Sequence, residues 1–190
     1  MAEEEAIKWR RFTKIVFHMQ LFLDQVESPI GTIVLISDGE VLRVLDFIDC
    51  EERMQKLLQV HYGKQKPVIG SRESAETKRI IQTYFAGDLT CIDKISVRTE
   101  GTPFQKLVWA ELRTIPAGST ISYGELAKRI GRPSASRAVG LANGSNPIAI
   151  VVPCHRVIGA DGSLTGYGGG IHRKRWLLEH ESSQRSLATL

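Results

Sequence analysis

The chain has 190 residues, of which 42% are hydrophobic, so it can bury one sizeable core, or the cores of a small and a medium domain. No stretch approaches the roughly 18 to 20 uninterrupted apolar residues that span a bilayer, and the acidic start, Met1 to Glu5, differs from the basic start of a signal peptide. These features exclude a membrane-spanning protein, and we expect a cytoplasmic one.

Basic residues concentrate in the second half of the chain. Residues 1–100 contain 14 Lys and Arg against 16 Asp and Glu, whereas residues 101–190 contain 11 against 5. A basic half beside a nearly neutral one indicates where a polyanion would bind, although a solvated basic face would have the same composition.

The three cysteines, Cys50, Cys91 and Cys154, are far apart and show neither a C-x-x-C pair nor the Cys/His spacing of zinc sites. We therefore expect no disulfide and no metal. A single cysteine in a reducing cytosol is most often a small buried hydrophobe, so the surrounding residues must identify a reactive one.

The first half predicts a sheet with helices. Residues 1–18 form an extension, either a disordered segment or a misplaced start, and β-type patterning with turn signals from residue 20 to 48 predicts a small antiparallel meander. Apolar residues at helical spacing predict one helix around residues 54–61 and another around 80–85, which stops at Gly87.

The second half predicts short helices. Thr102-Pro103 is a typical helix start, and an apolar stripe follows it as far as Leu112. A capping box at Ser122–Glu125 begins the next helix, Gly131-Arg132-Pro133 breaks it, and Ser134 can cap a further helix that stops at Asn143-Gly144. Two short helices around a three-residue break make a helix-turn-helix.

The second of these helices is rich in small residues, among them Ala138 and Gly140. Small side chains permit close approach, either to the rest of the protein or to a nucleic-acid groove. Helix-turn-helix units often bind DNA, which favours the second interpretation without excluding the first.

A reactive constellation follows at Pro153-Cys154-His155. The β-branched run from Ile148 to Val152 predicts a strand, and the proline ends it, so Cys154 is presented at a strand end. Adjacent residues on a strand point to opposite faces, so a contact between Cys154 and His155 requires a turn here. A neighbouring imidazole and the positive charge of Arg156 would favour the thiolate.

Two later segments could complete a site. A helix over residues 173–181 carries Glu179 and Glu181, either of which could orient the histidine. The glycine run around Tyr167 could form a pocket wall, or a surface loop without function.

The segment Pro153-Cys154-His155-Arg156-Val157 combines with Arg137-Ala138-Val139-Gly140, Asn146-Pro147, Tyr167 and Trp176-Leu177-Leu178 in one order and spacing. Together they resemble the methylated-DNA–protein-cysteine methyltransferases, above all the constitutive bacterial form, over residues 19 to 182. The resemblance implies repair of O6-alkylguanine in double-stranded DNA by irreversible alkyl transfer to the protein, without a cofactor. It leaves open whether O4-alkylthymine is a second substrate.

Carried over position by position, the resemblance makes Cys154 the alkyl acceptor. His155 would activate it through a water, and Glu181 rather than Glu179 would hold the histidine tautomer. Asn146 would connect the second helix of the helix-turn-helix, the recognition helix, to the turn that carries Cys154, the active-site turn. Tyr123 would crowd the 3′ phosphate and donate a proton toward guanine N3.

The resemblance also implies the residues that hold DNA and the base. Arg137 would enter the base stack in place of the flipped nucleotide. The carbonyls of Cys154 and Val157 would accept from the guanine amine, and Tyr167 would line the pocket. Further DNA contacts are expected at Ser134, Ala138 and Gly140. Many relatives have serine where this chain has Gly168, so a hydrogen bond to guanine O6 must come from the backbone N–H there.

We therefore predict an α+β fold with an N-terminal α/β domain (19–100), a mainly helical DNA-binding and alkyl-acceptor domain (101–182) and a tail (183–190). The expected partner is DNA carrying alkylated bases, bound by a monomer with little dependence on sequence. Three alternatives compete with this interpretation: a lesion sensor, against which Cys154 argues; a transcription regulator; and a cysteine hydrolase, which would turn over.

Overall fold

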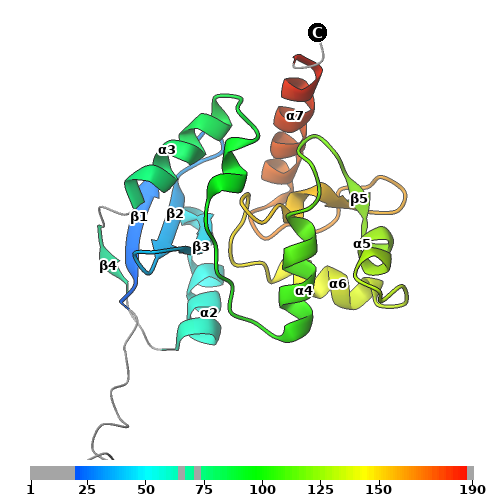
Figure 1. Ribbon diagram of the computed structural model, residues 1–190, viewed down its shortest axis with the longest axis horizontal. Coiled ribbons are helices and arrows are strands. Elements are labelled where there is room, and N and C mark those ends of the chain that lie inside the picture. The colour runs from blue at the N-terminus through cyan, green and yellow to red at the C-terminus, as the bar shows by residue number, and fades with distance from the viewer. Residues whose placement is uncertain (1–19, 64–66, 71–73, 188–190) are drawn as a thin grey trace, which may run out of the picture.

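The computed structural model describes residues 20–63, 67–70 and 74–187, and the predicted extension over residues 1–18 lies outside them. The first half forms a sheet with two helices, and the second half is mainly helical (Figure 1). This arrangement confirms the predicted α+β fold. Within the described residues, no helix is long and apolar enough to cross a membrane.

The sheet is built on the predicted meander. Strands β1 (Phe22–Val26), β2 (Ile33–Ser37) and β3 (Leu42–Phe47) pair antiparallel in sequence order. A two-residue strand, β4 (Val68–Ile69), joins the free edge of β1 in parallel and gives the order β3-β2-β1-β4. The sequence did not predict β4, because two exposed residues carry no recognisable alternation.

The two predicted helices of the first half are present as α2 (Glu51–Tyr62) and α3 (Ser74–Phe85). Short 3-10 turns, η1 (Ile48–Cys50) and η2 (Cys91–Lys94), adjoin them. Gly87 follows the end of α3 with a φ of 116°, a conformation that favours glycine and turns the chain away from the helix.

The second half contains the predicted helix-turn-helix. Helix α4 (Pro103–Leu112) precedes the short strand β5 (Ile121–Ser122), and α5 (Tyr123–Arg129) and α6 (Ser136–Gly144) form the pair.

The predicted cap at Ser134 is wrong. The N-cap of α6 is Ala135, which makes no side-chain cap. A backbone hydrogen bond from the Ala135 N–H to the Arg132 carbonyl closes a turn that contains Ser134, and the helix begins only after that turn.

The predicted strand over residues 148–152 is also wrong, because only Ile148 makes a bridge, to Leu45, and residues 149–152 form turns and a bend before η3 (Cys154–Arg156). Each of them is at most 3% exposed, so the apolar run reflects burial on all sides and not an extended backbone. The strand β6 (Val157–Ile158) comes after the cysteine and pairs in parallel with β5.

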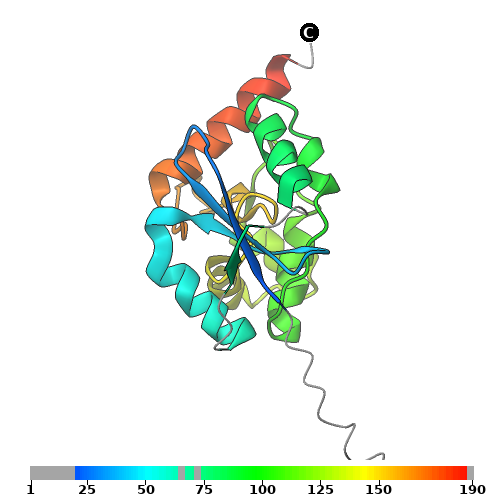
Figure 2. The same ribbon diagram turned by 90° about the vertical axis from the view of Figure 1, so that its left-hand side faces the viewer.

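Both halves contribute to one continuous hydrophobic cluster. The backbone of Leu45 in β3 donates to the Pro147 carbonyl (3.0 Å) and accepts from the Ala149 N–H (2.9 Å), so the turns before Cys154 are attached to the sheet edge. Helix α7 (Ile171–Leu187) runs past residue 182, where a tail was expected, and passes beside the end of α3 (Figures 1 and 2).

Candidate active site

Cys154 is the first residue of η3 and is only 5% exposed. Burial raises the pKa of its thiol above the ordinary value, while the Asn146 amide and the charges of Arg53 and Lys174 act in the opposite direction. The thiol is therefore protonated at neutral pH, and it needs a base to become a nucleophile.

His155 follows Cys154 within the same 3-10 turn and is fully buried. Its Nε2 lies 3.0 Å from Oε1 of Glu181, whereas its buried Nδ1 has no hydrogen-bond partner in the described structure. Burial lowers the pKa of His155, although Glu181 opposes this shift, so the imidazole is neutral. With the Nε2 proton donated to the carboxylate, Nδ1 carries a free lone pair.

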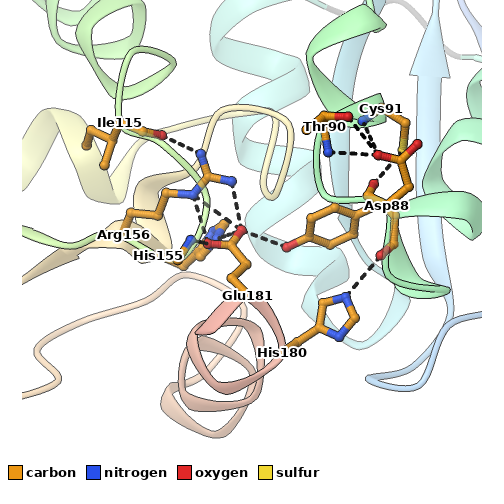
Figure 3. A network of polar contacts seen from close by, with 10 residues as sticks. Asp88, Thr90, Cys91, Ile115, His155, Arg156, His180 and Glu181 are labelled. Carbon is orange, nitrogen blue, oxygen red and sulfur yellow. Dashed lines mark hydrogen bonds and ion pairs between the residues drawn. The ribbon is translucent and has the colours of Figure 1, made fainter. Parts of the chain in front are cut away.

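The Glu181 carboxylate is fully buried and accepts hydrogen bonds from every side (Figure 3). Besides His155, its donors are the Arg156 guanidinium (Nη2 at 2.7 Å and Nε at 3.0 Å), the Tyr84 hydroxyl (2.8 Å) and the Gly118 N–H (3.2 Å). Burial alone would raise the pKa of Glu181, but His155 and Arg156 outweigh burial and hold it well below the usual range. Glu179, the other candidate carboxylate, is exposed.

Asn146 holds the turns that lead to the cysteine. Its Oδ1 accepts from the Ile148 N–H (3.0 Å), and its Nδ2 donates to the Val152 carbonyl (2.7 Å). These bonds satisfy buried backbone groups that a strand would have paired with a neighbouring strand. A different residue, Asn143 of α6, connects the recognition helix to the Cys154 carbonyl (3.3 Å).

The predicted pocket wall lies against the first half of the chain. A Cβ on Gly168 would collide with the Arg53 guanidinium of α2. The absence of a side chain at Gly168 therefore leaves room for Arg53 in its observed position. Arg53 also ion-pairs with the buried Asp46 and donates to the Asn146 carbonyl (2.8 Å). The buried hydroxyl of Tyr167 has no hydrogen-bond partner among the described residues.

A buried lysine, Lys174, holds the backbone that follows the active-site turn. Its Nζ donates to the carbonyls of Val157 (2.6 Å) and Thr165 (2.8 Å), and burial lowers its pKa to about 8. These two bonds satisfy the buried ammonium and fix the backbone at Val157 and Thr165.

Helix α6 both packs against the protein and faces solvent. Val139, Ala142 and Asn143 are buried, whereas Arg137 and Ala138 are exposed. The packing interpretation of this small-residue helix is therefore confirmed for one face, and the other face is accessible to a partner.

The Tyr123 ring lies beside that helix. A Cβ on Gly140 would sit 3.8 Å from the ring, and the Tyr123 hydroxyl lies 3.3 Å from Thr165 Oγ1. Ser134 is exposed in the turn before the helix.

Four residues that contact this site were missed by the sequence reasoning: Arg53, Tyr84, Asn143 and Lys174. Arg53 and Tyr84 reach the site from the first half of the chain, and Asn143, 11 residues before Cys154, was interpreted only as part of a helix stop. Lys174 lies between Arg173 and Arg175, so its charge does not distinguish it from its neighbours in the sequence.

Known proteins match most of this chain. The family model for the 6-O-methylguanine DNA methyltransferase DNA binding domain matches residues 103–183. The methylated-DNA–protein-cysteine methyltransferase of Shigella flexneri is 48% identical over 165 residues, 86% of this chain and 96% of the relative. The one from Mycobacterium tuberculosis is 51% identical over 159 residues, 84% and 91% of the two chains.

The chain belongs to the methylated-DNA–protein-cysteine methyltransferase family. The crystal structure of Mycobacterium tuberculosis OGT in complex with DNA superposes with a TM-score of 0.73 at 48% identity and covers 86% of this methyltransferase and 94% of that chain. The fold and the resemblance noted in the sequence are thereby confirmed.

We expect Glu181→Gln to lower the free energy of unfolding of this methyltransferase by about 3 to 5 kcal/mol, because it leaves the buried Arg156 guanidinium without a counter-charge. Urea unfolding monitored by circular dichroism measures the change. Glu179→Gln, an equivalent substitution at an exposed position of the same helix, should change it by about 0.5 kcal/mol or less.

The pH dependence supplies the second part of this test. Because the folded pKa of Glu181 is lowered, its contribution is complete above the ordinary value of 4.5 and is lost as the pH falls below that value. The difference between wild type and Glu181→Gln should therefore narrow on acidification. Equal losses of unfolding free energy in the two glutamine variants, or a difference that does not depend on pH, would contradict the assignment of Glu181 as the buried counter-charge of Arg156.

Proposed function

We propose that this methyltransferase repairs DNA by moving the alkyl group of O6-alkylguanine onto Cys154. The observation that carries the proposal is the buried arrangement in which the cysteine adjoins a neutral histidine oriented by Glu181. A thioether has no easy leaving group, so each molecule repairs one lesion and is then spent. No cofactor takes part.

The reaction begins with the loss of the thiol proton. His155 Nδ1 accepts it through a bridging water, and the Glu181 carboxylate stabilises the imidazolium that forms. The thiolate attacks the alkyl carbon in line with the bond to guanine O6. The S–C bond forms as the C–O bond breaks, and the guanine receives a proton at N3 from Tyr123.

The alkylated base must leave the helix before it can reach the buried thiol, at a cost of about a few kcal/mol. Arg137, exposed on α6, fills the space that the base vacates, and Tyr123 presses on the 3′ phosphate. The small residues Ala138 and Gly140 let the helix approach the groove closely, and Ser134 contacts DNA from the turn before it.

The flipped base lies between the active-site turn and the glycine-rich segment. The carbonyls of Cys154 and Val157 accept from the guanine amine, Tyr167 lines the pocket, and the Gly168 N–H donates to O6. Asn146 keeps the turn in place. Since thymine lacks an exocyclic amine, O4-alkylthymine would bind with fewer hydrogen bonds.

The residues assigned to DNA and alkyl transfer fall in the proposed domain 101–182, whereas the domain 19–100 supplies the rear support of the site. We propose a monomer that binds duplex DNA through its phosphates, with little dependence on sequence, in the cytoplasm. A lesion sensor would bind without transfer, a hydrolase would turn over, and a regulator would prefer one site.

We expect Cys154→Ser to abolish alkyl transfer and to leave binding to alkylated duplex within about tenfold, because a hydroxyl is far less acidic than a thiol but similar in size. Intact-mass measurement with excess alkylated duplex should show one alkyl group on wild type and none on the variant. Cys91→Ala changes a buried thiol of η2 that bonds the Ile80 and Asp88 carbonyls, and this variant should still accept one equivalent. Multiple turnovers by wild type would exclude this mechanism.

We expect Arg137→Ala to slow repair of duplex DNA by about tenfold or more, with little effect on transfer from the free alkylated base, since only a duplex needs its stack held open. Single-turnover rates on the two substrates measure the ratio. Arg175→Ala removes the same charge from an exposed position of α7 and should affect neither rate strongly. Equal losses on both substrates in Arg137→Ala would argue against its role.

We expect binding to undamaged duplexes to weaken steeply with salt, with a log-log slope of about −0.9 per phosphate neutralised, and to depend little on sequence. Titrations of unrelated duplexes at several salt concentrations measure both properties. One strongly preferred sequence, with penalties of about 1 to 3 kcal/mol per mismatched base pair, would support the regulator instead.

A further inference from the structure

The Tyr84 hydroxyl reaches the alkyl-acceptor site from the other half of the chain. It lies on α3, is fully buried, and donates to Glu181 Oε1 at 2.8 Å. The Tyr84 carbonyl accepts from His180 Nε2 at 3.0 Å, so the backbone and the side chain of this one residue both bind α7. The Tyr84 ring also packs edge-on against His180.

The hydroxyl shares an oxygen atom with the histidine. Oε1 of Glu181 accepts from Tyr84, from His155 and from Arg156 Nη2, whereas Oε2 accepts from Arg156 Nε and the Gly118 N–H. Because Glu181 is ionised, Tyr84 can act only as the donor in this contact. It therefore fixes the direction of Oε1 and takes up part of the charge that His155 would otherwise receive alone.

We infer that Tyr84 is a positioning residue for alkyl transfer, which holds Glu181 in the orientation that keeps His155 neutral and its Nδ1 free. This inference rests on the proposed function and extends it to the first half of the chain. In this role Tyr84 acts through Glu181 and His155.

The charged and titratable groups around Glu181 and His155 determine in which direction Tyr84→Phe shifts the pKa of His155. Around Glu181 and His155 lie Cys154 and Arg156 of η3, Lys174 and His180 of α7, and Tyr84 of α3, and Tyr167 acts on the Tyr84 hydroxyl from the glycine-rich segment. Tyr84→Phe removes one hydroxyl and leaves all of these charges in place. The carboxylate then interacts more strongly with His155, the pKa of the imidazole rises, and the neutral form is lost at a higher pH.

The experiment measures the single-turnover rate of methyl transfer from a duplex containing one O6-methylguanine, from about pH 5.5 to 9. For Tyr84→Phe we expect a rate about three- to tenfold lower near neutral pH. We also expect the acidic limb of the pH–rate profile to move to higher pH by about half a pH unit or more. Tyr62→Phe, which removes a buried hydroxyl of α2 away from Glu181, should keep the wild-type profile.

A second variant retains the hydrogen bond and so tests the inference even if Tyr84→Phe folds poorly. Tyr84→3-fluorotyrosine makes the hydroxyl a stronger donor, and the acidic limb should then move to lower pH. Wild-type profiles in both Tyr84 variants, or the same shift in Tyr62→Phe, would overturn the inference while leaving the proposed function intact. Failure of wild type to accept one methyl group would instead overturn the proposed function.

Discussion

The Glu181 carboxylate and the Arg156 guanidinium lie together out of contact with solvent, and an unpaired charge at that depth would cost several kcal/mol. The pair is stable because further donors satisfy both oxygens, and these donors come from α3, from η3 and from the segment before β5. Three parts of the chain must therefore meet at α7 for the charge to be buried. The orientation of His155 depends on that meeting.

The same buried arrangement keeps the Cys154 thiol and the His155 imidazole away from solvent. In the proposed mechanism, the buried thiol and the buried neutral imidazole do not react with solvent, and the fixed carboxylate stabilises the imidazolium that forms when the thiol proton moves. Electrostatic groups that are already oriented require no reorganisation at the moment of reaction. The rigid turn held by Asn146 serves the same purpose, since it fixes the backbone on the N-terminal side of Cys154.

The two halves of the chain therefore have different tasks at one site. Residues after 100 carry the thiol, its proposed base and the helix-turn-helix, whereas the sheet and its helices pack against these groups on the opposite side. Leu45 anchors the turns, Arg53 braces the Asn146 carbonyl and Tyr84 contacts Glu181. If Tyr84 acts as we propose, a substitution in the first half alters the chemistry without a contact to DNA or to the thiol.

Local features of the sequence were enough to predict the meander, the start of α4 and the helix-turn-helix, and to single out the segment at Cys154, because alternation, capping and glycine stops act over a few residues. The tertiary structure decided the rest. An apolar run records burial and not direction, so residues 148–152 were assigned a strand where the chain turns. Contacts such as Tyr84 with Glu181 join residues 97 positions apart, and only the packing of α3 against α7 brings them together.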